Sequence, residues 1–173
     1  MNHTPRVYCY FCATKLEEKS DFSWYCPQCE YVQYESPKPA TEIILRRDGK
    51  ILIAERGQEP DKGKYDMPGG FVEANETVEE AVLREANEEL GIGADDIEDL
   101  KYFTSFATHY LYGKEVYNVL VSVFVADLKD GVELESLDDV ASTRWISLED
   151  VDSVPWARDF QKQNAISVLS NNT

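Results

Sequence analysis

The sequence predicts an α/β fold, an α/β/α sandwich with a mixed sheet, preceded by a small cysteine-bearing module. Three observations predict this arrangement. Strand-like and helical segments alternate between residues 40 and 173, as is typical of α/β proteins. Segment 77–90 carries a helix-capping signal at its start and is followed by a glycine. All four cysteines lie within the first thirty residues. A chain of 173 residues can hold one domain with a good core and one small module.

The N-terminal module, predicted over residues 1–35, is defined by two Cys-x2-Cys pairs. Cys9 and Cys12 form the first pair, Cys26 and Cys29 form the second, and thirteen residues separate them. Such paired knuckles, in a chain without an export signal, indicate a structural zinc site with four thiolate ligands. A thirty-residue segment has too little core to fold alone, and a zinc ion would explain its order. A redox pair and simple buried thiols are the alternatives.

The residues around the knuckles suit a zinc ribbon with one departure. Pro27 fits the turn inside the second knuckle, but Ala13 and Glu30 stand where a glycine usually follows each knuckle. Aromatic side chains are frequent in the module and are expected to pack around the metal. They are Tyr8, Tyr10, Phe11, Trp24, Tyr25, Tyr31 and Tyr34.

A stiff linker and a β-hairpin are predicted next. Residues 36–39 contain two prolines, each of which restricts itself and the residue before it. Segments 40–47 and 51–56 are predicted to be partner strands joined by a turn at 48–50. The sequence then predicts a polar loop at 57–64 and an extended segment at 65–72.

A helix is predicted to begin at about Thr77. Thr77 and Glu80 form a capping box, and Gly91 stands where helices commonly end in a left-handed residue. Apolar side chains recur every four residues in between and form one stripe. They are Val78, Val82, Ala86 and Leu90. The later elements are strands at 102–112, 116–128 and 144–146, a brief helix from 147, and a last helix at 157–169.

Three glutamates follow one edge of this helix beside the apolar stripe. Glu85, Glu88 and Glu89 are spaced i, i+3 and i+4, so their carboxylates share one side of the helix. Carboxylates so close together repel one another unless a cation lies among them. Oxygen ligands suit Mg²⁺ or Mn²⁺, and these ions usually also hold substrate phosphates. The alternative is a solvated acidic helix face, which would explain Glu79 but not the glycines of the segment.

The whole segment from Gly70 to Ile92 follows the pattern G-x5-E-x7-R-E-x2-E-E-x-G-I. This pattern resembles the Nudix box, the signature of enzymes that hydrolyse a nucleoside diphosphate linked to another group. The resemblance implies the Nudix fold from about residue 40 to residue 173, and a pyrophosphatase activity. A ribbon directly before such a domain resembles the arrangement in NADH pyrophosphatases and their zinc-ribbon relatives.

The resemblance also implies roles for single residues. Glu85, Glu88 and Glu89 are expected to bind the catalytic Mg²⁺ or Mn²⁺, with the Gly70 carbonyl as a further ligand. Arg84 and Glu76 are expected to pair and brace the segment, so Arg84 belongs to the catalytic set in a structural role rather than a direct one. The general base varies among these enzymes and often lies outside the box. Acidic residues that remain open for this role are Glu115, Glu135, Asp138 and Asp139.

The substrate is left open by the box. NADH pyrophosphatases carry a Ser-Gln-Pro-Trp-Pro-Phe-Pro stretch after it, whereas residues 103–110 here read Phe-Thr-Ser-Phe-Ala-Thr-His-Tyr. ADP-ribose or a similar nucleotide sugar is therefore favoured over NAD(H). A housecleaning enzyme for nucleoside triphosphates is an alternative. A second alternative is a ligand sensor or binding module whose ribbon docks to a partner.

Composition limits the classes of partner that the protein is expected to bind. The net charge of −16 argues against a broad affinity for nucleic acid or anionic membranes. No apolar run approaches the length of a membrane span, and the first residues lack an apolar signal core, so a cytoplasmic protein is expected. Arg56 is a candidate phosphate contact and Tyr110 a candidate stacking residue, with a surface arginine and a core tyrosine as the alternatives. The ribbon is a candidate contact in a homodimer.

Overall fold

The computed structural model describes residues 7–113 and 115–171, which fall into two compact units. The first unit comprises the described residues of 1–38 and of 108–119. The second comprises 39–107 and the described residues from 120 onward. Residues 1–6 of the predicted ribbon, and residues 172 and 173 of the predicted domain, lie outside the described residues. The boundaries at 35 and 40 remain predictions.

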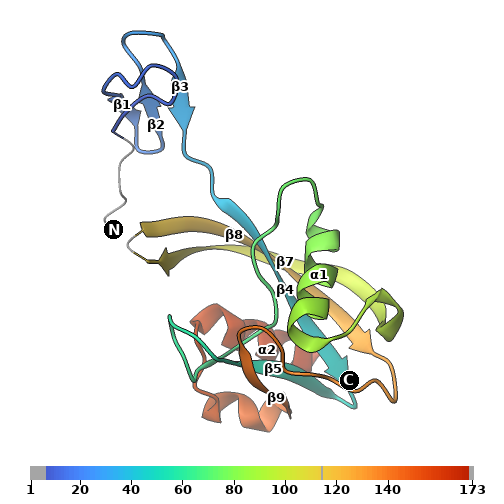
Figure 1. The fold of residues 1–173 in the computed structure, drawn as a ribbon. Coiled ribbons are helices and arrows are strands. Elements are labelled where there is room, and N and C mark those ends of the chain that lie inside the picture. Colours follow the sequence, from blue (N-terminus) through green and yellow to red (C-terminus); the bar gives the residue numbers. More distant parts are fainter. Residues whose placement is uncertain (1–6, 114, 172–173) are drawn as a thin grey trace. The chain divides into compact units, whose positions relative to one another are not determined.

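The first unit contains a three-stranded antiparallel sheet in the order β1 (Glu17–Ser20), β2 (Ser23–Tyr25) and β3 (Val32–Tyr34) (Figure 1). Its small core consists of Cys9, Leu16, Trp24 and Cys26. Such a core is far smaller than an independent domain needs, as the sequence suggested.

The tip of a long hairpin belongs to the same unit. The hairpin strands are β7 (Ile97–Tyr112) and β8 (Glu115–Leu128), and residues 108–119 form the tip. Asn118 Nδ2 donates to Glu35 Oε1 at 2.9 Å. The Lys38 ammonium lies 5.0 Å from the centroid of the Tyr117 ring, within cation–π range. The tip and the segment after the ribbon are thus joined by polar and aromatic contacts.

The second unit is built on a mixed six-stranded sheet. Its order is β6 (Tyr65–Asp66), β5 (Lys50–Arg56), β4 (Lys38–Arg47), β8 and β7, and β9 (Val140–Ile146) pairs with β5. Strands β4 and β5 form the predicted hairpin, with Arg46 opposite Ile51. Its turn is the pair Asp48 and Gly49, with φ angles of 52° and 70°. Two left-handed residues suit a tight hairpin turn.

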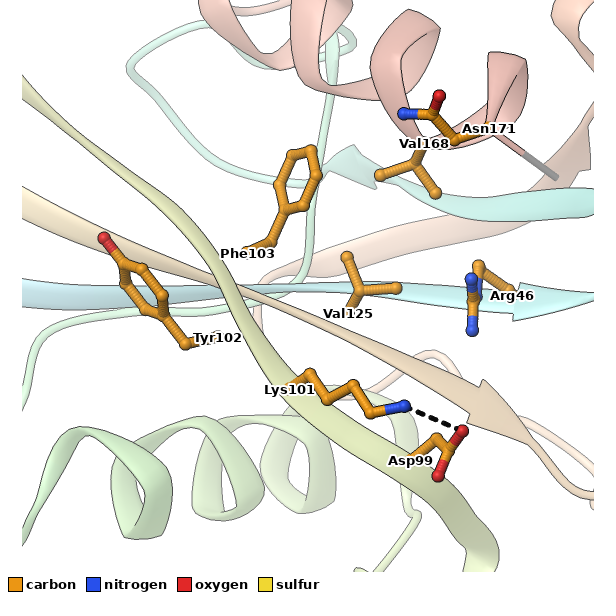
Figure 2. A pocket seen from close by; sticks show the side chains of 8 residues that line it. All are labelled: Arg46, Asp99, Lys101, Tyr102, Phe103, Val125, Val168 and Asn171. Carbon is orange, nitrogen blue, oxygen red and sulfur yellow. Dashed lines mark hydrogen bonds and ion pairs between the residues drawn. The ribbon is translucent and has the colours of Figure 1, made fainter.

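Helices cover both faces of this sheet. Helix α1 (Val78–Leu90) packs its apolar stripe against Ile43, Leu45 and Phe124 in the main core. Helix α2 (Asp159–Ser170) lies on the other side of the strands from α1 (Figure 2). Short 3₁₀ helices, η1 (Ala94–Asp96) and η2 (Leu148–Ser153), complete the unit. The predicted α/β/α sandwich with a mixed sheet is confirmed.

Some elements differ in extent from the prediction. The strand expected at 102–112 begins at Ile97, because pairing with β8 extends it through a polar stretch that shows no strand pattern. Of the extended segment 65–72, only Tyr65–Asp66 is strand, and Phe71 makes an isolated bridge with Ala40. The strand at 144–146 begins at Val140 because it pairs with β5 along that length.

Candidate functional site

Helix α1 positions the predicted ligands, and its ends are set by local signals. The Glu80 N–H donates to Thr77 Oγ1 at 3.2 Å, and the Thr77 N–H donates to Glu80 Oε2 at 2.8 Å. This is the predicted capping box. Gly91 ends the helix with a left-handed φ of 71°. Both ends of the helix are therefore where the sequence placed them, which puts the glutamate edge in the expected register.

Glu89 is the most enclosed of the predicted ligands. Its exposure is 7%, and its Oε2 accepts a hydrogen bond from the Gly69 N–H at 2.9 Å. The pKa of Glu89 is raised to about 9, mainly by burial and also by the charges of Asp139, Glu85 and Asp66, while the Gly69 hydrogen bond opposes the rise. A carboxyl group set among carboxylates in this way favours either a proton or a metal cation beside it.

Glu85 lies directly against the glycine pair before the helix. A Cβ atom at Gly70 would stand 2.7 Å from the Glu85 carboxyl carbon, so a side chain there would displace the Glu85 carboxylate. Gly69 has a φ of 148°, and a Cβ there would stand 2.8 Å from the Glu42 Cα. Burial raises the pKa of Glu85, while the adjacent Arg84 guanidinium opposes that rise. The two glycines allow the backbone to run between the glutamates and strand β4.

Arg84 connects the parts of this segment. It donates two hydrogen bonds to the Glu76 carboxylate, at 2.9 and 3.1 Å, and one to the Phe71 carbonyl at 3.0 Å. Its NH1 lies 2.8 Å from oxygens of both Glu85 and Glu88. Pairing with Arg84 lowers the pKa of Glu76, and the carboxylates in turn raise the pKa of Arg84. The guanidinium thus bridges the loop to the glutamate edge of α1.

Asp139 and Asp66 act electrostatically on Glu89, and Asp66 acts in turn on Glu42; of these three acidic residues, only Asp139 was a candidate. Asp139 was one of four possible general bases, and its charge raises the pKa of Glu89, Glu85 and Asp66. Asp66 and Glu42 were missed. Burial raises the pKa of Asp66 to about 6 and that of Glu42 to about 8. The sequence signal that could have indicated Glu42 is its position, because it is an acidic residue inside an otherwise apolar strand.

The other general-base candidates lie in different places. Glu135 lies beside the end of α1, where its Cγ would be 3.4 Å from a Cβ at Gly91. Asp138 is exposed and has a φ of 49°. Glu115 lies in the hairpin tip of the first unit, where it accepts a hydrogen bond from the Tyr117 hydroxyl at 3.0 Å. Among the four, Asp139 is the one that the structure brings into electrostatic contact with Glu89.

The two candidate substrate contacts have other neighbours. Arg56 Nε donates to the Pro60 carbonyl at 2.8 Å, and its NH1 lies 2.6 Å from Asp66 Oδ2. This guanidinium therefore holds the loop after β5 against β6. Tyr110 lies in the first unit and is half-buried. Contact of either residue with a substrate remains a prediction.

The four cysteines form a compact cluster. Their Sγ atoms all lie within 4.8 Å of one another, with separations of 3.5 Å for Cys12–Cys26, 3.6 Å for Cys9–Cys29 and 3.7 Å for Cys12–Cys29. A tetrahedral site with Zn–S bonds of about 2.3 Å has edges of about 3.8 Å. The cluster therefore fits a zinc ion well. Within the described residues it is also the one such grouping of metal-ligating side chains.

The knuckle backbones explain how Ala13 and Glu30 replace glycine. The Ala13 N–H donates to the Cys9 carbonyl and the Glu30 N–H donates to the Cys26 carbonyl, each at 2.9 Å. Both residues have left-handed φ angles, 55° and 61°. This conformation costs a non-glycine residue about 1–2 kcal/mol. The turns that glycine would favour are therefore present, with some backbone strain.

A pocket of about 250 Å³ lies elsewhere, on the α2 side of the sheet (Figure 2). Its charged side chains are already paired: Lys101 contacts Asp99 at 2.9 Å, and Arg46 contacts Asp127 at 2.7 Å. The rest of its lining is Tyr102, Phe103, Val125, Val168 and Asn171. The pocket contains none of the predicted site residues.

Comparison with known proteins identifies relatives of this chain. The NUDIX domain family matches residues 36–166. An ADP-ribose pyrophosphatase of Methanocaldococcus jannaschii is 36% identical over 122 residues, which cover 70% of this chain and 69% of that protein. The NAD-capped RNA hydrolase NudC of Klebsiella pneumoniae is 29% identical over 149 residues, covering 86% of this chain and 54% of that protein. This chain thus spans about half the length of NudC.

Solved structures share the fold. A NUDIX hydrolase from Nitrosomonas europaea superposes with a TM-score of 0.71 at 20% identity, covering 96% of this chain and 92% of that one. The NUDIX domain of Shewanella oneidensis NrtR, solved with ADP ribose, gives a TM-score of 0.65 at 19% identity, covering 86% and 94%. In the described part of the chain, every helix is too short or too polar to span a membrane.

Proposed function

We propose, since the chain belongs to the NUDIX domain family, that it is a divalent-metal-dependent pyrophosphohydrolase acting on ADP-ribose or a close analogue. The expected enzyme class, a Nudix hydrolase, is itself confirmed by the family match and by relatives named as pyrophosphatase and hydrolase. The observation that carries the proposal is Glu89, a carboxylate that is buried among other carboxylates next to the Gly69 backbone.

The residue types present suit a divalent cation, although Arg84 holds Glu85 and Glu88, and the described carboxylate oxygens are not gathered as closely as the cysteine sulfurs. Glu85, Glu88 and Glu89 supply carboxylate oxygens, and these are the donors that Mg²⁺ and Mn²⁺ prefer. The Gly70 carbonyl accepts the Thr41 N–H at 2.8 Å and keeps a second lone pair for a cation. A bound divalent ion supplies positive charge beside the diphosphate and lowers the pKa of water.

The protein groups around the site have separate tasks in this proposal. Arg84 holds Glu85 and Glu88 while it ties the loop through Glu76 to the helix. The Gly69 N–H orients the Glu89 carboxylate. Asp139 is our choice for the general base, because it is the candidate whose charge acts on both Glu85 and Glu89.

The substrate proposal draws on the relatives and on the sequence. One relative is named ADP-ribose pyrophosphatase and another NAD-capped RNA hydrolase. The chain lacks the Ser-Gln-Pro-Trp stretch expected of NADH pyrophosphatases at 103–110. This difference supports ADP-ribose over NAD(H) as the preferred substrate.

A substrate panel tests the proposal. The purified chain is incubated with ADP-ribose, NADH, NAD, nucleotide sugars, dinucleoside polyphosphates and nucleoside triphosphates, each with Mg²⁺ or Mn²⁺, and products are separated by chromatography. We expect AMP and ribose 5-phosphate from ADP-ribose, because attack falls within the diphosphate. Pyrophosphate release from triphosphates alone would instead support a housecleaning enzyme. Tight binding of ADP-ribose without turnover would support a ligand sensor.

We further propose that the cysteine cluster holds one structural zinc ion. Four thiolates fill a tetrahedral shell and leave no open position for catalysis. Cys9 and Cys26 are buried in this small core, so zinc binding would supply most of the free energy that folds it. Elemental analysis of protein purified without added metal should give one zinc per chain. Four thiols that react freely without a chelator would contradict this assignment.

A further inference from the structure

Three buried polar atoms between strand β4 and helix α2 lack a partner among the described residues. They are Glu42 Oε2, Gln161 Oε1 and Asn164 Nδ2. Gln161 is 2% exposed, whereas Glu42 and Asn164 are partly exposed, so the group lies just beneath the surface. Gln161 and Asn164 are three residues apart on α2 and share one side of that helix.

One hydrogen bond fixes the orientation of this group. Gln161 Nε2 donates to Glu42 Oε1 at 2.8 Å, across 119 residues of sequence. If the Gln161 amide were turned over, its oxygen would face a second acceptor, so the observed orientation is the one that can bond. When Glu42 is ionised, the arrangement presents two acceptors, Glu42 Oε2 and Gln161 Oε1, and one donor from Asn164. Burial raises the pKa of Glu42 to about 8, and a ligand that donates to Oε2 would favour the ionised form.

Leaving these atoms unpaired is costly. A buried polar group without a hydrogen bond loses about 1–3 kcal/mol, and native proteins hold few such groups. Three together between β4 and α2 indicate a specific partner. Its chemistry is the complement of the group: two N–H or O–H donors next to one acceptor.

A pair of aromatic rings involves the residue before Gln161. Phe160 directly precedes Gln161, and its ring lies 3.5 Å from that of Phe106, centroid to centroid, with the planes tilted by 33°. Both rings are partly exposed. A flat apolar surface beside a few directed polar atoms is the usual makeup of a site for a heteroaromatic ring.

The group also lies close to the proposed reaction centre. Glu42 follows Thr41, whose N–H donates to the Gly70 carbonyl. The charges of Asp66 and Arg56 also act on Glu42. A nucleotide whose diphosphate lies at the glutamates of α1 can therefore place its base near Glu42.

We propose that Glu42, Gln161 and Asn164 recognise the amino edge of adenine in the substrate. The exocyclic amino group supplies two N–H donors to Glu42 Oε2 and Gln161 Oε1, and a ring nitrogen accepts from the Asn164 amide. Phe106 and Phe160 supply the apolar wall. This inference rests on the proposed function for the placement of the nucleotide, and it adds the base specificity.

The test compares ADP-ribose with its hypoxanthine analogue, which carries an oxygen in place of the amino group. We expect the unmodified protein to favour ADP-ribose by about ten- to a hundredfold in kcat/KM, because the analogue leaves buried acceptors unpaired. Glu42→Gln and, separately, Gln161→Leu should bring this ratio close to one, mainly by loss on ADP-ribose. Lys162→Ala is the matched control, since Lys162 contacts only Asp152 in an exposed ion pair among the described contacts.

The ribose of the adenosine also carries two hydroxyl donors that could pair with these acceptors. A second comparison therefore distinguishes recognition of the ribose from recognition of the base. If the variants change the response to 2′-deoxy-ADP-ribose and leave the adenine-to-hypoxanthine ratio intact, the base assignment is wrong. An unmodified protein that treats both bases alike also overturns it. If the protein hydrolyses neither nucleotide, the proposed function fails, and calorimetric binding of AMP against IMP decides the inference: AMP must bind more tightly, and Glu42→Gln must remove the difference. Melting curves of each variant show that it is folded.

Discussion

Replacing Glu89 by glutamine should stabilise the protein when divalent metal is absent. Glu89 is 7% exposed and lies among the charges of Asp139, Glu85 and Asp66. Folding without a cation therefore forces this carboxyl group to take up a proton. Glutamine has the same shape, needs no proton, and can still accept from the Gly69 N–H.

The size of the effect follows from the pKa. Its value rises from 4.5 to about 9 on folding, so the folded protein binds the additional proton. Stability from this group is complete below pH 4.5 and is lost as the pH rises towards 9. Each pH unit above 4.5 costs about 1.4 kcal/mol, so the penalty is about 3 kcal/mol at pH 7 and under about 1 kcal/mol at pH 5. The penalty at pH 7 does not depend on the exact pKa of Glu89 in the folded protein, provided that this pKa exceeds about 8.

Thermal unfolding of the two proteins at several pH values measures this penalty. For a domain of this size, about 3 kcal/mol corresponds to a gain of roughly 6–12 °C in Tm at pH 7, and the gain should fall to roughly 2–4 °C at pH 5. The protein is dialysed free of Mg²⁺ and Mn²⁺ without a strong chelator, so that the cysteine site is undisturbed. Glu79→Gln, an exposed position on the same helix, should shift Tm little at either pH.

A Tm gain that is equal at pH 5 and pH 7 would refute this reasoning, because it would show that charge is not the cause. Added Mg²⁺ provides a further check. It should raise the Tm of the unmodified protein more than that of Glu89→Gln, since one ligand charge is missing in the variant.

Three other predictions concern the proposed metal site and the cysteine module. Glu89→Gln should lower kcat by at least a hundredfold at saturating Mg²⁺ with the fold intact, and near-normal turnover would remove Glu89 from the site. Gly70→Ala should displace the Glu85 carboxylate and cost about 1–3 kcal/mol with a large loss of turnover, whereas Gly93→Ala, whose nearest contact would be 3.8 Å away, should leave turnover unchanged. Glu30→Gly should stabilise the ribbon by about 1 kcal/mol by relieving its φ of 61°, as judged by slower zinc release to a chelator; an equal or faster release would show that this backbone is not strained.

Local signals in the sequence accounted for the helix and the cysteine cluster. Thr77, Glu80 and Gly91 specify the ends of α1 through contacts within a few residues, and the glutamate edge then follows from the helical repeat. The cysteines were equally predictable, because each knuckle is a short turn with two residues between its ligands. Such features depend little on how the rest of the chain folds.

The rest of the site depends on contacts between distant segments. Gln161 on α2 donates a hydrogen bond to Glu42 on β4, and nothing near either residue in the sequence indicates the other. Asp139 could not be separated from Asp138, because the distinction depends on how the loop before β9 approaches Glu89. Arg56 looked available for a phosphate, but Asp66 and the loop carbonyl of Pro60 hold it, and these partners come from the loop and strand that follow it.

The hairpin tip has a consequence for how the chain tolerates change in length. Residues 108–119 belong to the same unit as the cysteine module, joined through Asn118 to Glu35 and through Tyr117 to Lys38. Removing the first 38 residues would therefore not leave a self-contained catalytic half, because it would strip the tip of its neighbours. Insertions, deletions or domain exchanges at the N-terminus would therefore disturb contacts about eighty residues downstream, and we expect the two segments to vary together.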